Sequence, residues 1–248
     1  MNPASPTAFE PVVDQIAAGI FRISTWVPEV SESGFTFNQF LVTGDEPLLF
    51  HTGMRGLFPL VAEAVARIIP VESLRWISFG HVEADESGAV NMWLDAAPTS
   101  EVAFGALGCD ISLNDMCDRA PRPLRNGEVL DIGGHRLRQV STPHVPHGWE
   151  AQVLFDETTD TLLCGDLLTQ VGYGPALTTG DVLSSALEAE EIFRASTLAP
   201  QTGAVLRGLG DLQPTTLAVM HGSSFHGDGR QVLYDMADAY ESLTARVA

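Results

Sequence analysis

The stretch Phe79-Gly80-His81-Val82-Glu83-Ala84-Asp85 marks the end of a predicted strand, because the apolar residues stop at Phe79 and polar side chains follow at once. The apolar run at 75–79 predicts a short buried strand. Alternate residues of an extended loop face the same side, so His81, Glu83 and Asp85 can converge on one point. An imidazole and two carboxylates at a strand end predict a metal site.

Three further predicted strand ends carry side chains that can bind metal. In chain order these are His144 and His147 together, then Asp166, then His221. His147 follows His81 by 66 residues, Asp166 follows 19 residues later, and His221 follows 55 residues after that. Sites are usually built where strands end, and each of the four predicted strand ends offers a side chain that can bind metal.

The predicted elements form two similar halves. Strand ranges mix β-branched and aromatic residues with polar ones, whereas helix ranges repeat apolar residues at helical spacing. The predicted strands are 12–25 and 35–50, each a hairpin, then 75–79, 129–132, 137–141, 151–155, 161–164 and 217–220. The predicted helices are 56–69, 182–193 and 232–247. Each half is thus a sheet covered on its outer face by helices, and we expect one domain over residues 1–248.

The composition excludes several classes of protein. With 13 Lys plus Arg against 32 Asp plus Glu, the formal charge of −19 argues against nucleic-acid binding. All 13 basic residues are Arg, which excludes a Walker phosphate loop and a pyridoxal Schiff base. The three cysteines show no C-x-x-C spacing, which indicates a reducing compartment. No apolar run approaches the roughly 18 residues of a membrane span, so we expect a cytoplasmic protein without a membrane segment.

In the order and spacing of these motifs the sequence resembles the metallo-β-lactamase superfamily. The resemblance implies an α/β fold, the αββα sandwich, in which two mixed sheets flanked by helices hold metals at their strand ends. Zinc hydrolases of the superfamily typically have H-x-H-x-D-H, and Glu83 stands where they have their second histidine. The H-x-E-x-D form resembles the di-iron branch, the flavodiiron proteins and the shorter oxygen-binding di-iron proteins.

The resemblance also implies the metal ligands and the metal. One iron is bound by His81, Glu83 and His147, the other by Asp85 and His221, and Asp166 bridges the two. The implied cofactor is a pair of iron ions with an oxo or hydroxo bridge, for which zinc or manganese can substitute. Elementary chemistry agrees, because replacing an imidazole by a carboxylate hardens the site and favours iron over zinc.

Two positions near the implied ligands depart from the pattern of the superfamily. Glu86 follows Asp85 where many relatives have histidine, so Glu86 or water completes the second metal site. The stretch His51-Thr52-Gly53 has histidine where the superfamily often has aspartate.

Four further residues are candidates for the surroundings of the metals. His144 competes with His147 as a ligand, although the 19-residue step to Asp166 favours His147, and His144 then supports the site by a hydrogen bond or is a loop residue. Glu150 is either a similar support or a solvated carboxylate. Trp149 either forms a wall of a gas pocket or belongs to the core, and Tyr173 lies either over the site on a loop or in an exposed turn.

The leading functional hypothesis is a non-haem di-iron protein that binds dioxygen as a sensor or scavenger. The first alternative is an oxygen or nitric oxide reductase fed by an external electron donor, since we expect no flavodoxin domain and no flavin in this chain. A metallohydrolase of an ester, thioester or phosphoester is the second alternative, although the carboxylate of Glu83 suits an anionic substrate poorly. The expected partners are an external reductase or a signalling protein, and a homodimer is compatible with the sequence.

Overall fold

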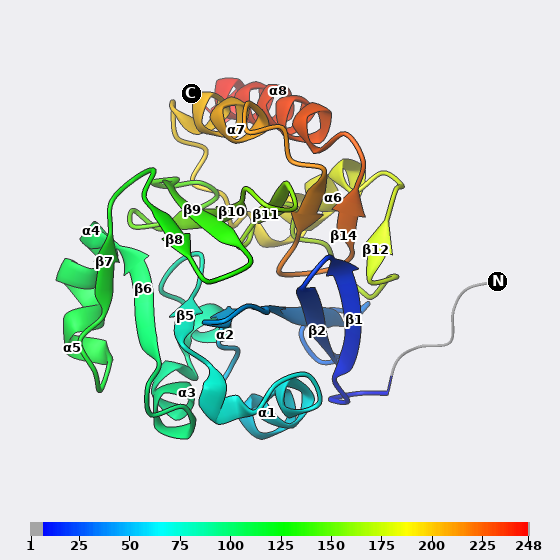
Figure 1. The fold of residues 1–248 in the computed structure, drawn as a ribbon. Helices are drawn as coiled ribbons and strands as arrows, with labels where there is room; N and C mark the ends of the chain where they lie inside the picture. The colour runs from blue at the N-terminus through cyan, green and yellow to red at the C-terminus, as the bar shows by residue number, and fades with distance from the viewer. Residues whose placement is uncertain (1–6, 248) are drawn as a thin grey trace.

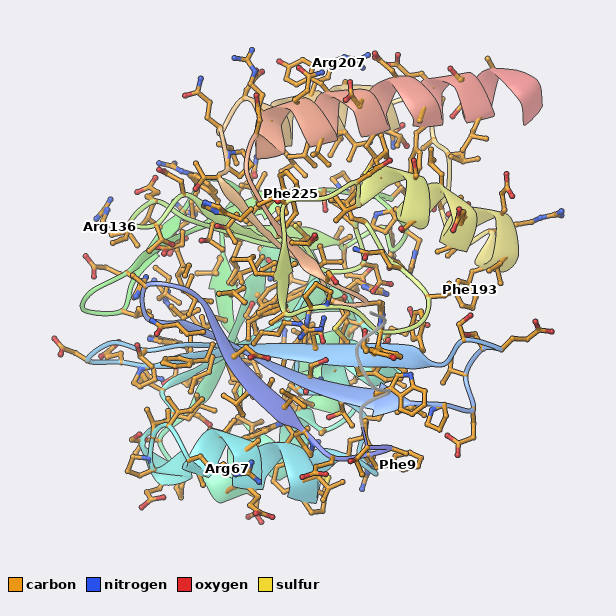
Figure 2. All side chains as sticks on the ribbon, turned by 90° about the vertical axis from the view of Figure 1, so that its right-hand side faces the viewer. Phe9, Arg67, Arg136, Phe193, Arg207 and Phe225 are labelled. Atoms are coloured by element: carbon orange, nitrogen blue, oxygen red, sulfur yellow. The ribbon has the colours of Figure 1, made fainter. Side chains whose placement is uncertain are left out.

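Two seven-stranded mixed sheets face each other, and helices cover the outer face of each (Figure 1). This computed structural model describes residues 7–247, so residues 1–6 and 248 of the expected domain lie outside the described part of the chain. The layered architecture is the predicted αββα sandwich. In Figure 2 the labelled Arg67 and Arg207 mark the two opposite helical layers.

The first sheet has the strand order β1-β2-β3-β4-β5-β6-β7. Its strands are β1 (Val12–Ala17), β2 (Ile20–Val27), β3 (Phe35–Val42), β4 (Leu48–Phe50), β5 (Trp76–Ser78), β6 (Glu101–Gly105) and β7 (Arg122–Leu124). Strands β1 to β4 pair antiparallel, which confirms both predicted hairpins, and β4 to β7 pair parallel. Because β4 to β7 run parallel, β5 ends at the edge of the first sheet that lies next to the strand ends of the second sheet.

The second sheet has the order β12-β14-β13-β11-β10-β9-β8. Its strands are β8 (Val129–Asp131), β9 (Arg136–Ser141), β10 (Gln152–Asp156), β11 (Thr161–Leu163), β12 (Leu177–Thr178), β13 (Thr216–Ala218) and β14 (Ser224–His226). The predicted hairpins β8–β9 and β10–β11 are confirmed, and β11 runs parallel to β13. Parallel pairing makes β11 and β13 end side by side.

Helices pack on the outside of both sheets because each has one apolar face. The first sheet is covered by α1 (Phe58–Ala66) and α3 (Val90–Ala96), the second by α6 (Leu183–Phe193), α7 (Thr202–Gly210) and α8 (Gly229–Val247) (Figure 1). Short turns of helix lie at η1 (Val71–Ser73), α2 (Ala84–Ser87), α4 (Ala106–Gly108), η2 (Cys109–Leu113) and α5 (Asn114–Met116). The helix predicted at 56–69 is confirmed but is shorter at both ends.

Three apolar clusters hold the layers together. One lies between the two sheets and includes Phe40, Phe50 and Leu154, and the other two lie under the helices of each sheet. In the described residues no helix is both long and apolar enough to cross a membrane.

A polar contact also joins the two sheets close to the predicted site. Asn38 on β3 is fully buried, and its Nδ2 donates to the carbonyl oxygens of Val219 at 2.8 Å and Gly222 at 3.0 Å. Since a buried amide needs such partners, this pair of bonds fixes the turn after β13 against the first sheet. His221 lies in that turn.

Candidate metal centre

The ends of β5, β11 and β13 meet in one place and bring the candidate residues together. His81 follows β5, Asp166 follows β11, and His221 follows β13. The close approach of the first two depends on glycine, because a Cβ atom on Gly80 would lie 3.1 Å from the Cα atom of Gly165. Gly165 also has a positive φ of 56°, which glycine adopts at little cost.

Four side chains form the first group of potential ligands. His81 Nε2 lies 2.7 Å from Glu83 Oε2 and 2.9 Å from His147 Nε2. His147 Nε2 lies 3.2 Å from Glu83 Oε2 and 3.4 Å from Asp166 Oδ2. All four ligand atoms lie within 4.8 Å of one another, so one ion can contact all of them.

Asp85, Asp166 and His221 form the second group. His221 Nε2 lies 3.3 Å from Asp85 Oδ2 and 3.2 Å from Asp166 Oδ1. Asp166 therefore presents Oδ2 to the first group and Oδ1 to the second, as a bridging carboxylate must. Asp85 Oδ1 and Asp166 Oδ1 are buried without a hydrogen-bond partner among the described residues, which fits two adjacent cations.

The surroundings of His221 fix which ring nitrogen faces the site. Its Nδ1 donates to the backbone oxygen of Thr36 at 2.8 Å, and its ring stacks on Phe35 with centroids 4.2 Å apart. Nε2 is thereby left for a metal. No sequence signal marks Thr36, because its contribution is a backbone oxygen on a strand of the other sheet.

Glu86 lies beside the first group, and its carboxylate belongs to neither group. The fully buried carboxylate accepts the backbone N–H groups of Gly80 and His81, the latter at 2.8 Å. Its Oε1 lies 3.3 Å from His81 Nδ1 and 3.6 Å from His51 Nε2. Of the two alternatives for completing the second metal site, Glu86 or water, the geometry does not favour Glu86, because its carboxylate contacts His81 Nδ1 and belongs to neither group.

The two departures from the superfamily pattern, His51 and Glu86, are thus neighbours. His51 is also fully buried, and its Nδ1 lies 3.0 Å from the backbone oxygen of Asn38. An imidazole at one strand end and a carboxylate on the next helix are therefore close neighbours, and both are fully buried.

The loop between β9 and β10 places His147, and not His144, at the first group. His144 has a positive φ of 65° and lies outside both groups. Glu150 accepts the backbone N–H of Val82 at 3.0 Å, so it supports the loop that carries the first motif.

Both aromatic candidates lie away from the metal cluster. Trp149 is 56% exposed and is neither part of the core nor a wall of the cavity at the site. Tyr173 packs edge-to-face on Trp26, with ring centroids 5.9 Å apart, and lies beside the β2 strand instead of over the site. The hypothesis that either one covers the metals is wrong, because Trp149 is exposed to solvent and the ring of Tyr173 packs on Trp26.

A cavity of about 390 Å³ opens onto both groups. Glu83, Asp85 and Asp166 line one end, and the walls are mainly apolar, with Phe35, Ala186, Ala189 and Phe193 among them. Phe193 lies at the end of α6, as Figure 2 shows. A cavity of this size gives a small molecule access to both groups of potential ligands.

Before a metal binds, the carboxylates and imidazoles of the cluster hold each other charged. Burial lowers the pKa of His81, but Glu86 and its other acidic neighbours outweigh it and raise this pKa to about 12. Burial also opposes the charge of His221, and Asp166 and Asp85 raise its pKa to about 10. Burial raises the pKa of Asp166, yet the surrounding imidazoles lower it to about 2.

The model of a known family, described as ODP family beta lactamase, matches residues 35–222. The chain belongs to the ODP family. The match spans both sheets and contains all six predicted ligands. The description of the family model also confirms the predicted resemblance to the metallo-β-lactamase superfamily.

Curated relatives and solved structures agree with the family. A protein of Nostoc sp. (strain PCC 7120) named "Putative diflavin flavoprotein A 1" is 29% identical over 141 residues, which are 54% of this chain and 24% of that protein. The chain thus spans about a quarter of the length of the curated relatives it first matches.

Two solved structures share the fold over nearly the whole chain. The metal-soaked Flv1 flavodiiron core from Synechocystis sp. PCC6803 has a TM-score of 0.81 and 19% identity, covering 96% of this chain and 62% of that one. Rubredoxin oxygen:oxidoreductase from Desulfovibrio gigas has a TM-score of 0.80 and 18% identity, covering 92% and 62%. The αββα fold of the ODP family member is thereby confirmed.

The loop geometry of the family member predicts different effects for its two neighbouring histidines. His147→Ala removes a nitrogen from the first group, so we expect the loss of about one metal ion per chain. His144→Ala leaves both groups intact and should leave the metal content unchanged. Metal analysis of the two purified variants checks this, and the reverse result would assign the ligand role to His144.

Glu86→Gln should weaken metal binding without removing a ligand. The amide keeps the size of the side chain but loses the ionic contact with His81 Nδ1, and loss of such support typically lowers metal affinity roughly 10- to 100-fold. Competition with a chromophoric zinc chelator measures the affinity, and Glu188→Gln, an exposed change on α6, is the control. A drop in the number of ions bound, with unchanged affinity for the rest, would show that Glu86 is a ligand.

Metal binding should release protons and strengthen as the pH rises. Because the pKa values of His81 and His221 are raised to about 12 and about 10, both imidazoles are protonated at pH 7 and must lose these protons to bind metal. The apparent affinity should rise by about tenfold per pH unit for each displaced proton. Zinc titration calorimetry in two buffers of different protonation enthalpy counts the protons, and an affinity that stays constant from pH 6 to 8 contradicts the assignment.

Proposed function

We propose that this member of the ODP family is a non-haem di-iron protein that binds dioxygen, as a sensor or a scavenger. The observation that carries the proposal is the pair of adjacent ligand groups that share Asp166. A shared carboxylate holds two cations at a short distance from each other, which a mononuclear site does not need.

The ligand set favours iron by its charge and its hardness. Glu83, Asp85 and Asp166 contribute three negative charges against four positive charges from two ferrous ions, so the site keeps a net charge of +1 before any hydroxide binds. When bound, the two ferrous ions supply electrons and open coordination positions for dioxygen. Carboxylate oxygens are hard ligands and suit iron better than the softer donors of typical zinc sites.

The side chains of this protein position the site and keep it partly dry. Glu86 and the Thr36 oxygen turn His81 and His221 so that their Nε2 atoms face inward. Phe35 and Phe193, with the alanines of α6, line the cavity through which a small molecule reaches the carboxylates. Dioxygen is small and apolar, so this lining favours it over charged molecules of the same size.

The names of the relatives support the same gas chemistry. One protein of similar fold is named rubredoxin oxygen:oxidoreductase, so its name says that it acts on oxygen. The curated relatives are named as flavoproteins. A reductase of oxygen or nitric oxide, with an external protein as its electron donor, is therefore the second candidate function. The two candidates differ in whether electrons are resupplied.

The experiment combines metal analysis with oxygen uptake. Protein loaded anaerobically with ferrous ions should hold close to two irons per chain and should take up about one dioxygen per iron pair, without continued consumption. An oxygen electrode measures the uptake, first with the loaded protein alone and then with a reductase and nicotinamide added. Rapid, sustained consumption with the donor would establish the reductase instead.

Variants at the bridge connect the result to the site. Asp166→Ala removes an oxygen from both groups and should lose both irons, whereas His221→Ala should lose mainly one. Equal and mild losses in the two variants would contradict a bridging Asp166. Stoichiometric zinc after iron loading, with rapid hydrolysis of a thioester or phosphoester, would overturn the di-iron proposal in favour of a metallohydrolase.

A further inference from the structure

A second cavity, of about 430 Å³, lies outside the metal centre and is lined in part by the buried side chain of Arg22. It is bounded by β1, β2, the start of β3 and the segment that precedes β12, on the side of the molecule that faces the viewer in Figure 2. Arg22, Ser24 and Thr36 supply its polar lining, and Trp26 and Tyr173 supply aromatic walls. Neither metal-ligand group contributes to it.

The guanidinium of Arg22 forms few hydrogen bonds with the described residues of the protein. Arg22 is only 3% exposed, its Nη2 donates to the Gly222 oxygen at 2.9 Å, and its Nε has no hydrogen-bond partner among the described residues. Asp14 lies opposite Arg22 in the β1–β2 register, but within the described part of the chain no carboxylate comes within 4.0 Å of the guanidinium. A buried charge without an ionic partner is unfavourable, so an anion entering the cavity gains a strong partner.

Arg22 is charged at neutral pH and has the geometry for a carboxylate. Burial lowers the pKa of Arg22 to about 10, against the effect of Asp14, which raises it. The planar guanidinium presents N–H groups in a fork that matches the two oxygens of a carboxylate. The hydroxyls of Ser24 and Thr36 lie on the same cavity wall and can donate to the same group.

The remaining lining favours an apolar or aromatic body on the ligand. Trp26 and Tyr173 meet edge-to-face at 5.9 Å and 67°, and Pro175 and Ala176 extend the apolar wall. Cavities of this size hold small organic molecules and are larger than a simple inorganic anion needs. We propose that this cavity is a binding site for a small organic carboxylate with an aromatic body, anchored by Arg22.

The site shares a wall with the metal centre. Gly222 directly follows His221. Its backbone oxygen accepts a hydrogen bond from Arg22 Nη2, and its N–H donates to Thr36 Oγ1 at 2.7 Å. The carboxylate therefore binds behind the turn that carries a predicted metal ligand, on the opposite side from the metal-centre cavity.

Calorimetric titration of the purified protein with three related probes tests the proposal. Phenylacetate should bind, whereas phenethylamine, which has the same ring and the opposite charge, should not. Phenylalanine should bind more weakly than phenylacetate, because its ammonium group lies next to its carboxylate and is repelled by the guanidinium of Arg22. Tighter binding of phenethylamine than of phenylacetate would overturn the proposal, since the cavity would then select through Asp14.

Substitutions distinguish this site from binding of the carboxylate to the metals. Arg22→Met should weaken phenylacetate binding by at least about tenfold, as expected for loss of a charged hydrogen-bonded pair. Asp14→Asn should strengthen binding a few-fold by removing the only acidic group in the lining. Arg55→Met, an exposed change of the same charge and size, should leave the affinity unchanged.

A second variant keeps the test decisive if Arg22→Met fails to fold. Ala176→Phe fills the cavity from a loop and leaves Arg22 in place, so it should abolish binding while the thermal unfolding temperature stays close to that of the parent. Phenylacetate binding that persists in Ala176→Phe, or in a folded Arg22→Met, overturns the proposal and assigns the carboxylate to the metal centre.

Discussion

The buried carboxylate of Glu86 is the contact on which the arrangement of the metal centre depends. It accepts the N–H groups at the end of β5 and faces the imidazoles of His51 and His81. The backbone oxygen of Glu86 also accepts the N–H of Thr52, which follows β4. One residue thus ties two neighbouring strand ends to the short helix α2, and the first motif cannot shift without leaving a buried charge unpaired.

The metal centre follows from this constraint and from the way the two sheets meet. The first sheet supplies His81, Glu83 and Asp85, and the second supplies His147, Asp166 and His221. Asn38 and Thr36 on β3 reach across to the turn that carries His221, so the two halves of the site are held in register by polar contacts. The arrangement of the site therefore depends on the packing between the two sheets.

The strongly periodic elements were predictable, and several short ones were not. The hairpins β1–β2 and β3–β4 and the helices α1, α6 and α8 follow from local patterns of apolar residues. Strands β6, β7, β12 and β14 were not predicted. Of these, β7, β12 and β14 have two or three residues each and, unlike the equally short β4, β5 and β11, lie in no predicted hairpin or apolar run. Helices α3 and α7 were also missed, and in α7 the glycines weaken the helical pattern.

The fold class, the family and the six side chains that meet at the strand ends could be predicted from the sequence, because the residue types and their spacing are local properties of the chain. The directions of the neighbouring side chains became known only from the three-dimensional structure. It turned Glu86 away from the second ligand group and paired it with His51, and it placed Tyr173 beside Trp26 and left Trp149 exposed. These outcomes depend on contacts between segments far apart in the chain, where burial and pairing of charges, and not local sequence, fix the side-chain directions.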